Sequence, residues 1–239
     1  MSEHRQNPRC ISHGATEVAA SDVAVSDTVV LVHGLAANSL IMAPLERSLS
    51  GCFRTVVNWD YSSLWSPIEQ HGKQLAAVLK RLDEEAMGPV HLVTHSMGGI
   101  ISRLALGEYQ PRRLGRFVMI APPNRGSRVA SWLAPYLGRI CPPLVQLADL
   151  EDSFVCCLPK PNVADLGIIA ADTDYLVCET STRLGCETDH ITLPGLHSSL
   201  LWKIETARQV THFLQNGRFE RESPEARACE AAAARSAAA

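Results

Sequence analysis

The chain has 239 residues, and 46% of them are hydrophobic, which suits one α/β domain with a sizeable buried core. Its 22 lysines and arginines nearly balance its 25 acidic residues. We therefore expect the basic cluster of Arg112, Arg113 and Arg116 to be a solvated loop face and not a nucleic-acid-binding patch. The N-terminus lacks the apolar core of a signal peptide and no apolar run is long enough to span a bilayer, which predicts a cytoplasmic protein without a transmembrane segment.

Strand patterns begin after a polar N-terminal segment. Residues 1–26 are small and polar without periodicity, and we expect a flexible arm with at most one edge strand. Apolar runs without polar alternation follow, and they are typical of strands covered on both faces, as in a parallel sheet. The six predicted strands are TVVLVHG (28–34), FRTVVNWDY (53–61), GPVHLVTH (88–95), GRFVMIAPP (115–123), LGIIAAD (166–172) and HITLPG (190–195).

Helical patterns fill the gaps between these strands. Ser66, Pro67 and Glu69 form a capping-box pattern that predicts a helix with proline at its first position. A second apolar pattern at helical spacing covers 199–215. Alternating strands and helices predict an α/β fold with a doubly wound, mostly parallel sheet of about six strands, flanked by helices, in a domain spanning 27–217. Ligands of such sheets bind at the carboxyl ends of the strands.

Ser96 lies at such an end, between the strand VHLVTH and a helical pattern. A serine on a sharp strand-to-helix turn projects into a cleft, and the turn requires small residues two positions before and after it. Gly98 meets that requirement and Gly99 allows a neighbouring element to approach, whereas Thr94 stands where glycine is usual. The simpler interpretation is a serine that caps an ordinary helix.

A second post-strand loop supports a nucleophilic serine. A hydroxyl needs a base to take its proton and donors to hold the oxyanion that forms. After the strand VVLV and His33–Gly34, the backbone N–H of Leu35 is expected to converge with that of Met97 on the developing negative charge. These two N–H groups form the predicted oxyanion hole.

Three segments together resemble a known family. VVLVHGLAAN (29–38), VHLVTHSMGG (90–99) and APPNRGS (121–127) are similar to segments of α/β-hydrolase-fold proteins, specifically the small bacterial-type lipases and esterases. The resemblance extends over about 28–219. It implies the α/β-hydrolase fold with at most a small lid, and an activity that needs no cofactor or metal.

The same resemblance implies a triad in the order nucleophile, acid, base. Ser96 corresponds to the nucleophile and His197, after the last strand, to the base. The segment DTDYLV aligns the acid with Asp174, and Asp172 is the alternative because it directly follows its strand. Tyr175 stands where glycine usually follows the acid.

The implied function is hydrolysis of carboxylic esters, small or lipid-like, through an acyl-enzyme intermediate. Acyl transfer to another acceptor, or cleavage of thioesters or amides, is an alternative because all of these use the same triad. A non-catalytic interaction protein on the same fold is the other alternative.

The other histidines have simpler interpretations. We expect His33 to support the oxyanion loop from beneath, His95 to point away from the cleft, and His190 to be structural. His71 is expected at the surface. No cluster has zinc-ligand spacing, and no P-loop or G-x-G-x-x-G motif occurs.

The segment 122–162 is the longest without a strand pattern. It is either a small lid whose apolar face lines an acyl-binding cleft or an ordinary crossover packed on the sheet. Tyr61 and Trp65 either line the same cleft or pack in the core.

The C-terminal residues and the cysteines complete the prediction. The alanine-rich tail, 218–239, has no apolar face and is expected to be disordered. The chain has eight cysteines without a C-x-x-C pair, and we expect reduced, mostly buried thiols. Cys178 and Cys186 would form a disulfide only in an exported protein.

Overall fold

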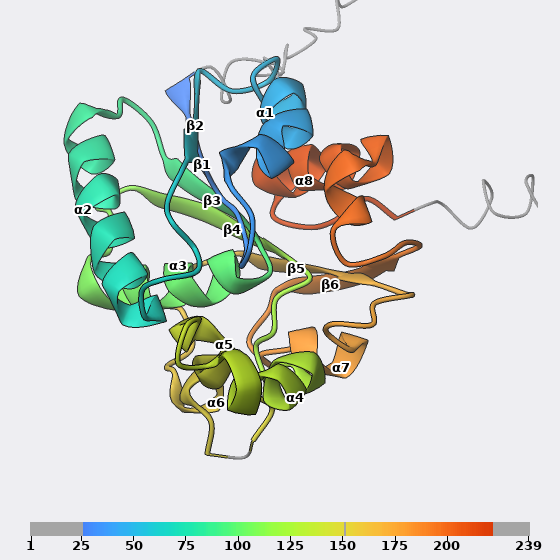
Figure 1. The fold of residues 1–239 in the computed structure, drawn as a ribbon. Coiled ribbons are helices and arrows are strands. Elements are labelled where there is room, and N and C mark those ends of the chain that lie inside the picture. Colours follow the sequence, from blue (N-terminus) through green and yellow to red (C-terminus); the bar gives the residue numbers. More distant parts are fainter. Residues whose placement is uncertain (1–25, 151, 222–239) are drawn as a thin grey trace, which may run out of the picture.

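The computed structural model describes residues 26–150 and 152–221, and its centre is a six-stranded sheet (Figure 1). The strands run in the order β2-β1-β3-β4-β5-β6, and every pair is parallel. The predicted α/β class and strand number are confirmed. The strands are β1 (Thr28–Val32), β2 (Thr55–Trp59), β3 (Val90–His95), β4 (Leu114–Ile120), β5 (Leu166–Ala171) and β6 (Asp189–Leu193).

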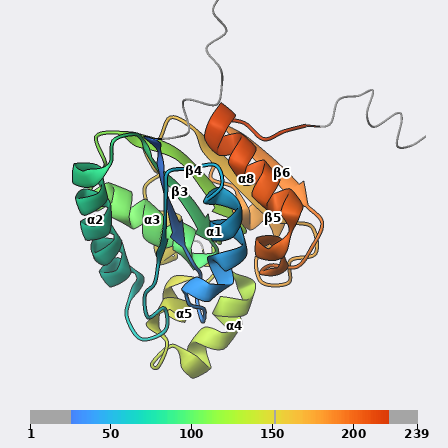
Figure 2. The same cartoon turned by 90° about the horizontal axis from the view of Figure 1, so that it is seen from above.

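Helices cover both faces of this sheet, with α2 and α3 on one face and α1 and α8 on the other (Figure 2). The helices α4, α5 and α6 lie together at the end of the molecule beyond α3 (Figure 1). The elements are α1 (Ala43–Leu49), α2 (Ile68–Glu85), α3 (Met97–Glu108), α4 (Arg128–Leu137), α5 (Pro142–Gln146), α6 (Phe154–Cys157), α7 (Glu179–Thr182) and α8 (Ile204–Asn216), with the short 3-10 helices η2 (Ser39–Met42) and η3 (Ser199–Trp202).

The strand β1 shows why its sequence is apolar throughout. Successive side chains of a strand point to opposite faces, so Val30 and Val32 pack under α2 and α3 while Val29 and Leu31 pack under α1 and α8. All four side chains are fully buried. A strand in this position has no solvent-facing side, and polar residues would have no place in it.

The predicted capping box is wrong. The helix α2 begins at Ile68, Pro67 is its N-cap, and Ser66 makes no capping hydrogen bond. The N–H of Ile68 donates instead to the side-chain oxygen of Gln146 in α5, at 2.7 Å. A residue 78 positions away therefore provides the cap, which no local pattern indicates.

The predicted helix over 199–215 is also only partly correct. The chain forms η3, passes through the extended backbone of Lys203, and then forms α8. Leu200 and Leu201 are nevertheless buried against the sheet. The apolar spacing therefore predicted the buried face correctly but not the break.

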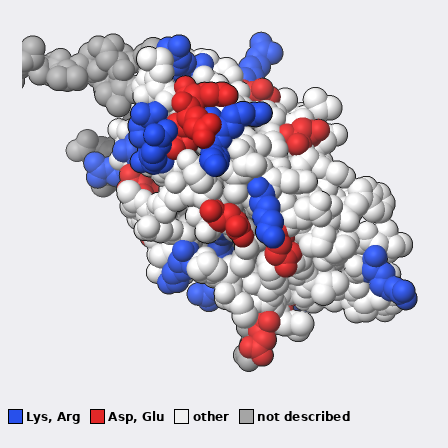
Figure 3. Space-filling model, turned by 90° about the vertical axis from the view of Figure 1, so that its left-hand side faces the viewer, with Lys and Arg blue, Asp and Glu red and all other residues white. Residues whose placement is uncertain are grey.

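Two arginines of the cluster are paired with acids, and the third, Arg113, donates to the carbonyl oxygen of Ala86. Arg112 donates to the buried carboxylate of Asp83 at 2.9 Å, and Arg116 donates to Asp165 at 2.9 Å. On the face shown in Figure 3, positive and negative side chains gather together and do not form a basic patch. This arrangement agrees with a solvated ionic surface.

The prediction of mostly buried thiols is wrong for the described residues. All six cysteines there are free, and only Cys141 is buried, while Cys178 and Cys186 are exposed and unbridged. The N-terminal arm and most of the C-terminal tail lie outside the described residues. Within the described ranges, no helix combines the length and hydrophobicity that crossing a bilayer requires.

Candidate active site

The sheet reverses its order between β1 and β3, and the loops that follow these two strands meet there. In α/β sheets this switch point is where ligands bind. Ser96 joins β3 to α3 with φ 52° and ψ −125°, a conformation that non-glycine residues rarely adopt. The strained turn raises the serine side chain above the carboxyl edge of the sheet.

Two glycines make this turn possible. A Cβ at Gly98 would lie 2.4 Å from the carbonyl oxygen of Val32, and a Cβ at Gly34 would lie 2.9 Å from the Cβ of Ser96. Real Cβ atoms do not approach backbone this closely, so the loop after β1 and the start of α3 pack without side chains between them.

Thr94, which replaces the usual glycine, is fully buried. A Cβ at Gly99 would lie 3.4 Å from the Thr94 hydroxyl and 3.3 Å from the Cβ of Pro122. Thr94 and Pro122 therefore both border the space that the absent side chain at position 99 leaves.

His197 and Asp174 form a close pair on the loops after β6 and β5. The Nδ1 of His197 lies 2.6 Å from the Oδ2 of Asp174, and the Asp174 side chain is only 1% exposed. Its Oδ1 accepts hydrogen bonds from the backbone N–H groups of Leu176 and Val177, at 2.8 and 2.9 Å. Burial alone would raise the pKa of this carboxyl, but the hydrogen bonds outweigh burial and hold the pKa below its usual value.

Asp172, the alternative acid, lies elsewhere. It is exposed, and its Oδ1 accepts from the backbone N–H of Gly195 at 2.9 Å and from the Thr173 hydroxyl at 2.8 Å. These bonds lower the pKa of Asp172. Asp172 thus ties the loop after β5 to the loop that leads to His197, and makes no contact with the imidazole.

The loop after β1 brings Leu35 to the same edge. Leu35 lines the cavity that contains Ser96, and the next residue, Ala36, has φ 54°. The loop rests on His33, which is fully buried and stacks on Tyr61 with ring centroids 4.1 Å apart. The Tyr61 hydroxyl donates to the carbonyl oxygen of His33 at 2.8 Å. His33 therefore occupies the expected supporting position beneath the loop.

His95 and His71 are not where the sequence predicted them. His95 lines the cavity beside Ser96, and its Nε2 donates to the carbonyl oxygen of His197 at 3.3 Å. Burial lowers the pKa of His95 to about 3, so it remains neutral and holds the His197 loop. His71 is buried, because its position on α2 places it against Tyr61, with ring centroids 4.8 Å apart. His190, as expected, is structural: its Nε2 lies 3.0 Å from the Thr182 hydroxyl.

A cavity of about 280 Å³ joins these groups. Ser96, His95, His197 and Ser198 form its polar side. Tyr61 and Trp65 do not line it: Tyr61 is buried in the core and Trp65 is exposed. The remaining lining is mostly apolar and comes from the loop after β1 with η2, from the loop after β4, from α4, from α5 and the residue after it, and from the loop after β5: Leu35, Ala36, Ala37, Ile41, Pro123, Ser127, Val129, Ala130, Leu133, Leu144, Leu147, Leu176 and Val177.

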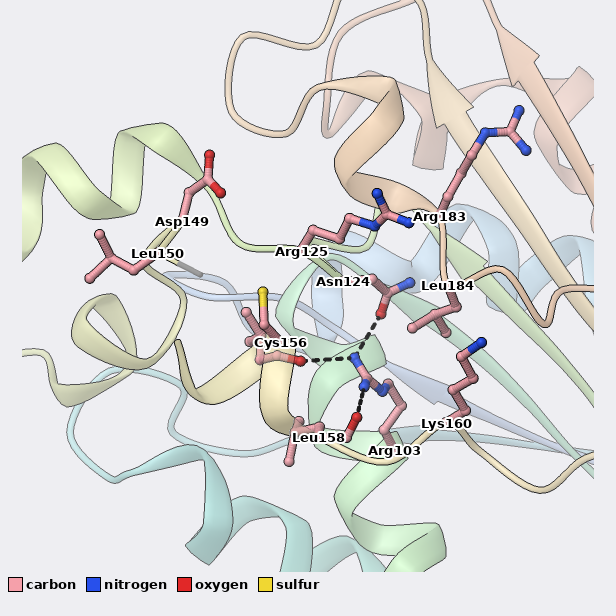
Figure 4. A pocket seen from close by; sticks show the side chains of 11 residues that line it. Arg103, Asn124, Arg125, Asp149, Leu150, Cys156, Leu158, Lys160, Arg183 and Leu184 are labelled. Atoms are coloured by element: carbon pink, nitrogen blue, oxygen red, sulfur yellow. Dashed lines mark hydrogen bonds between the residues drawn. The ribbon is translucent and has the colours of Figure 1, made fainter. Parts of the chain in front are cut away.

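A second cavity, of about 420 Å³, is lined by Asn124 and Arg125, which follow Pro123 of the first cavity in the loop after β4 (Figure 4). Its floor is Arg103, a buried residue of α3 that sequence reasoning missed. Its guanidinium donates to the side-chain oxygen of Asn124 at 3.3 Å and to the carbonyl oxygen of Leu158 at 2.7 Å, and burial lowers its pKa to about 10. Asn124 in turn donates to the carbonyl oxygen of Thr182 at 2.7 Å. Arg103 thus fastens the loops around the first cavity to α3.

Within residues 26–150 and 152–221, no group of three or more His, Cys, Asp or Glu side chains has the arrangement of a metal site.

Known proteins share this architecture. The mature lipase BlEst2 of Bacillus licheniformis superposes with a TM-score of 0.61 at 22% identity, over 75% of this chain and 88% of that protein. Aspergillus fumigatus lipase B gives a TM-score of 0.66 at 16% identity, over 89% of this chain and 57% of that protein. The type II thioesterase BorB from the borrelidin biosynthetic cluster gives 0.54 at 16% identity, over 80% and 92%. At these identities the likeness shows the fold alone.

Sequence comparison identifies the family. No curated protein matches the chain significantly. The family model described as Alpha/beta hydrolase family matches residues 29–231, which is most of the chain and includes every element of the sheet. The predicted resemblance to α/β-hydrolase-fold proteins is confirmed, and this chain belongs to the alpha/beta hydrolase family.

Proposed function

We propose that the chain is a serine hydrolase that cleaves carboxylic esters through an acyl-enzyme intermediate, with Ser96 as nucleophile, His197 as base and Asp174 as the acid that orients it. The observation that carries this proposal is the 2.6 Å contact between Asp174 and His197 at a cavity that His197 shares with Ser96. A carboxylate on Nδ1 fixes the proton there and leaves Nε2 free to accept one.

In the first step the Ser96 hydroxyl attacks the ester carbonyl while the Nε2 of His197 takes its proton. The imidazolium that forms is stabilised by Asp174, whose carboxylate is already ionised because its pKa is lowered. His197 then gives the proton to the departing alcohol. In the second step water replaces the alcohol, His197 activates it, and the acid is released.

The oxyanion of each tetrahedral intermediate needs two donors. We propose the backbone N–H groups of Leu35 and Met97, because Leu35 lines the cavity and Met97 directly follows Ser96. Met97 is also the first residue of α3, whose dipole adds partial positive charge at this point. None of these steps requires a cofactor.

The cavity supports an ester with an apolar acyl group. Beyond its polar side the lining is aliphatic, and an acyl chain placed there removes apolar surface from water on both sides. Val129, Leu133 and Leu144 come from α4 and α5, so the segment 122–162 contributes a wall of this site. We propose that this segment acts as a small lid.

Replacing Ser96 by alanine tests the assignment. Hydrolysis of a chromogenic short-chain ester should fall to background, and the wild type should be labelled at Ser96 by a fluorophosphonate. Ser198→Ala is the matched control because Ser198 lines the same cavity, and it should keep both activity and labelling. Activity that survives in Ser96→Ala at an unchanged thermal midpoint would reject Ser96 as the nucleophile.

Product analysis separates the alternatives that share the triad. Release of free acid from an oxygen ester supports the proposal, whereas a preference for thioesters, amides or a second acyl acceptor would change the reaction class. Folded protein without labelling at Ser96 would favour a non-catalytic interaction protein.

A further inference from the structure

Exposed apolar side chains occur in several of the segments that line the cavity containing Ser96. Leu176 lines the cavity, and four more directly precede a lining residue in the sequence, while Tyr136 packs near Trp132 with ring centroids 6.2 Å apart. They come from four separate segments of the chain and are 44–80% exposed. We call this set the rim: Leu40, Trp132, Tyr136, Tyr175, Leu176 and Leu196.

The α4 side of the rim carries net positive charge. The segment 122–149 contains three arginines and one acidic residue, Asp149, whose backbone N–H donates to the Ser131 hydroxyl of α4 at 2.6 Å, although the whole chain has a net charge of −3. Arg128 and Arg139 are exposed and lie at the two ends of α4, on either side of Trp132 and Tyr136. A tryptophan and a tyrosine flanked by arginines is the composition of a helix that lies at an anionic lipid surface.

We propose that the rim docks on an anionic lipid surface and holds the cavity mouth against it. A lipid surface fits better than a folded protein because the rim encloses an open apolar cavity, which a lipid chain can enter directly from the surface. This inference rests on the proposed function for its purpose, since it places the substrate in the lipid phase. The binding itself depends on the rim and the two arginines and not on Ser96.

Cosedimentation with vesicles measures this binding. The probes are vesicles of phosphatidylcholine alone and of phosphatidylcholine with phosphatidylglycerol in equal parts, mixed with the inactive Ser96→Ala chain so that no lipid is consumed. We expect stronger partitioning onto the anionic vesicles, reduced by added salt. Arg128→Ala combined with Arg139→Ala should weaken it roughly 25-fold, because each cation near an anionic surface contributes about fivefold.

The aromatic residues have their own test. Trp132→Ser combined with Tyr136→Ser should weaken partitioning at least tenfold, on the order expected for losing the burial of one large apolar side chain. In an otherwise wild-type chain the same double variant should leave hydrolysis of a short, soluble ester unchanged, because neither side chain lines the cavity.

Two controls match these variants. Met87→Ser removes an equally exposed apolar side chain at the opposite end of the sheet, before β3, and Lys80→Ala combined with Arg81→Ala removes two exposed cations from α2. Neither should change vesicle binding. If these controls weaken it as much as the rim variants do, the binding is non-specific and the proposal is wrong.

The remaining outcomes separate this inference from the proposed function. Hydrolysis of soluble esters without vesicle binding would overturn the inference and leave the function intact. Vesicle binding by a folded chain that a fluorophosphonate does not label would support the inference and overturn the proposed function. Self-association in the absence of lipid, abolished by Trp132→Ser with Tyr136→Ser, would assign the rim to a second copy of the chain and overturn the inference.

Discussion

Replacing Asp174 by asparagine should move one proton on the ring of His197 while the geometry of the pair stays nearly unchanged. The Oδ1 of Asp174 accepts from the N–H groups of Leu176 and Val177, so in the variant the amide oxygen must stay there, because an NH2 group would face two donors. The NH2 group then faces the Nδ1 of His197, which must accept. The ring proton moves to Nε2, and His197 can no longer take a proton from Ser96.

The expected loss follows from this reversal. A histidine held in the wrong tautomer lowers kcat by about 10⁴ even when the geometry is kept. Asp172→Asn is the matched control: its Oδ1 accepts from Gly195 and Thr173, and an amide oxygen can do the same, so kcat should fall less than about tenfold. Initial rates with a chromogenic ester, normalised to titrated active sites, provide the comparison. Equal losses, or a larger loss in Asp172→Asn, would refute Asp174 as the orienting acid.

Three further changes test the glycines of the turn at Ser96, the apolar wall of the cavity and the ionisation of Asp174. Gly98→Ala places a Cβ 2.4 Å from the Val32 carbonyl oxygen and should destabilise the fold by about 3 kcal/mol or prevent folding, whereas Gly99→Ala, whose nearest neighbour is a side chain at 3.3 Å, should cost less in urea unfolding. Leu133→Trp should fill the cavity and lower kcat/KM for long-chain esters relative to acetates by about tenfold or more. Because the pKa of Asp174 is lowered by folding, its stabilising contribution is present above about pH 4 and is lost as the pH falls through the lowered pKa. Urea unfolding of the wild type should therefore lose more stability between about pH 5 and 3 than unfolding of Asp174→Asn, and parallel pH profiles would contradict this.

The sheet was predictable because its determinants are local. The strands β1, β3 and β5 are short, mostly apolar runs that are buried along their whole length, and the sharp turn at Ser96 is encoded by neighbouring glycines. The neighbouring residues in the sequence do not show which of the two aspartates after β5, Asp172 or Asp174, contacts His197. What distinguishes them is the direction each side chain takes, and that depends on backbone donors at Leu176 and Val177, which any residue type can supply.

The errors at His71 and His95 have a common cause. A histidine in an amphipathic helix or beside a catalytic turn looks solvent-facing in sequence, but its burial depends on which element packs against it. His71 meets the ring of Tyr61, from the loop after β2. His95 meets the carbonyl of His197, which lies 102 residues away. Neither partner leaves a signal near the histidine it contacts.

The loops of the candidate site are tied to one another as well as to the sheet. Asp172 joins the loop after β5 to the loop after β6, and His95 joins that loop to the end of β3. Asn124 joins the loop after β4 to α7, and Arg103 joins that loop and the segment after α6 to α3, which follows Ser96 directly. From the sequence, Asp172 is expected only as an alternative acid, His95 is expected to point away from the cleft, and Asn124 and Arg103 are assigned no role. The loops that carry His197 and Asp174 are therefore held by polar contacts spread across the chain, most of them buried, and this is why the site is harder to predict than the sheet that carries it.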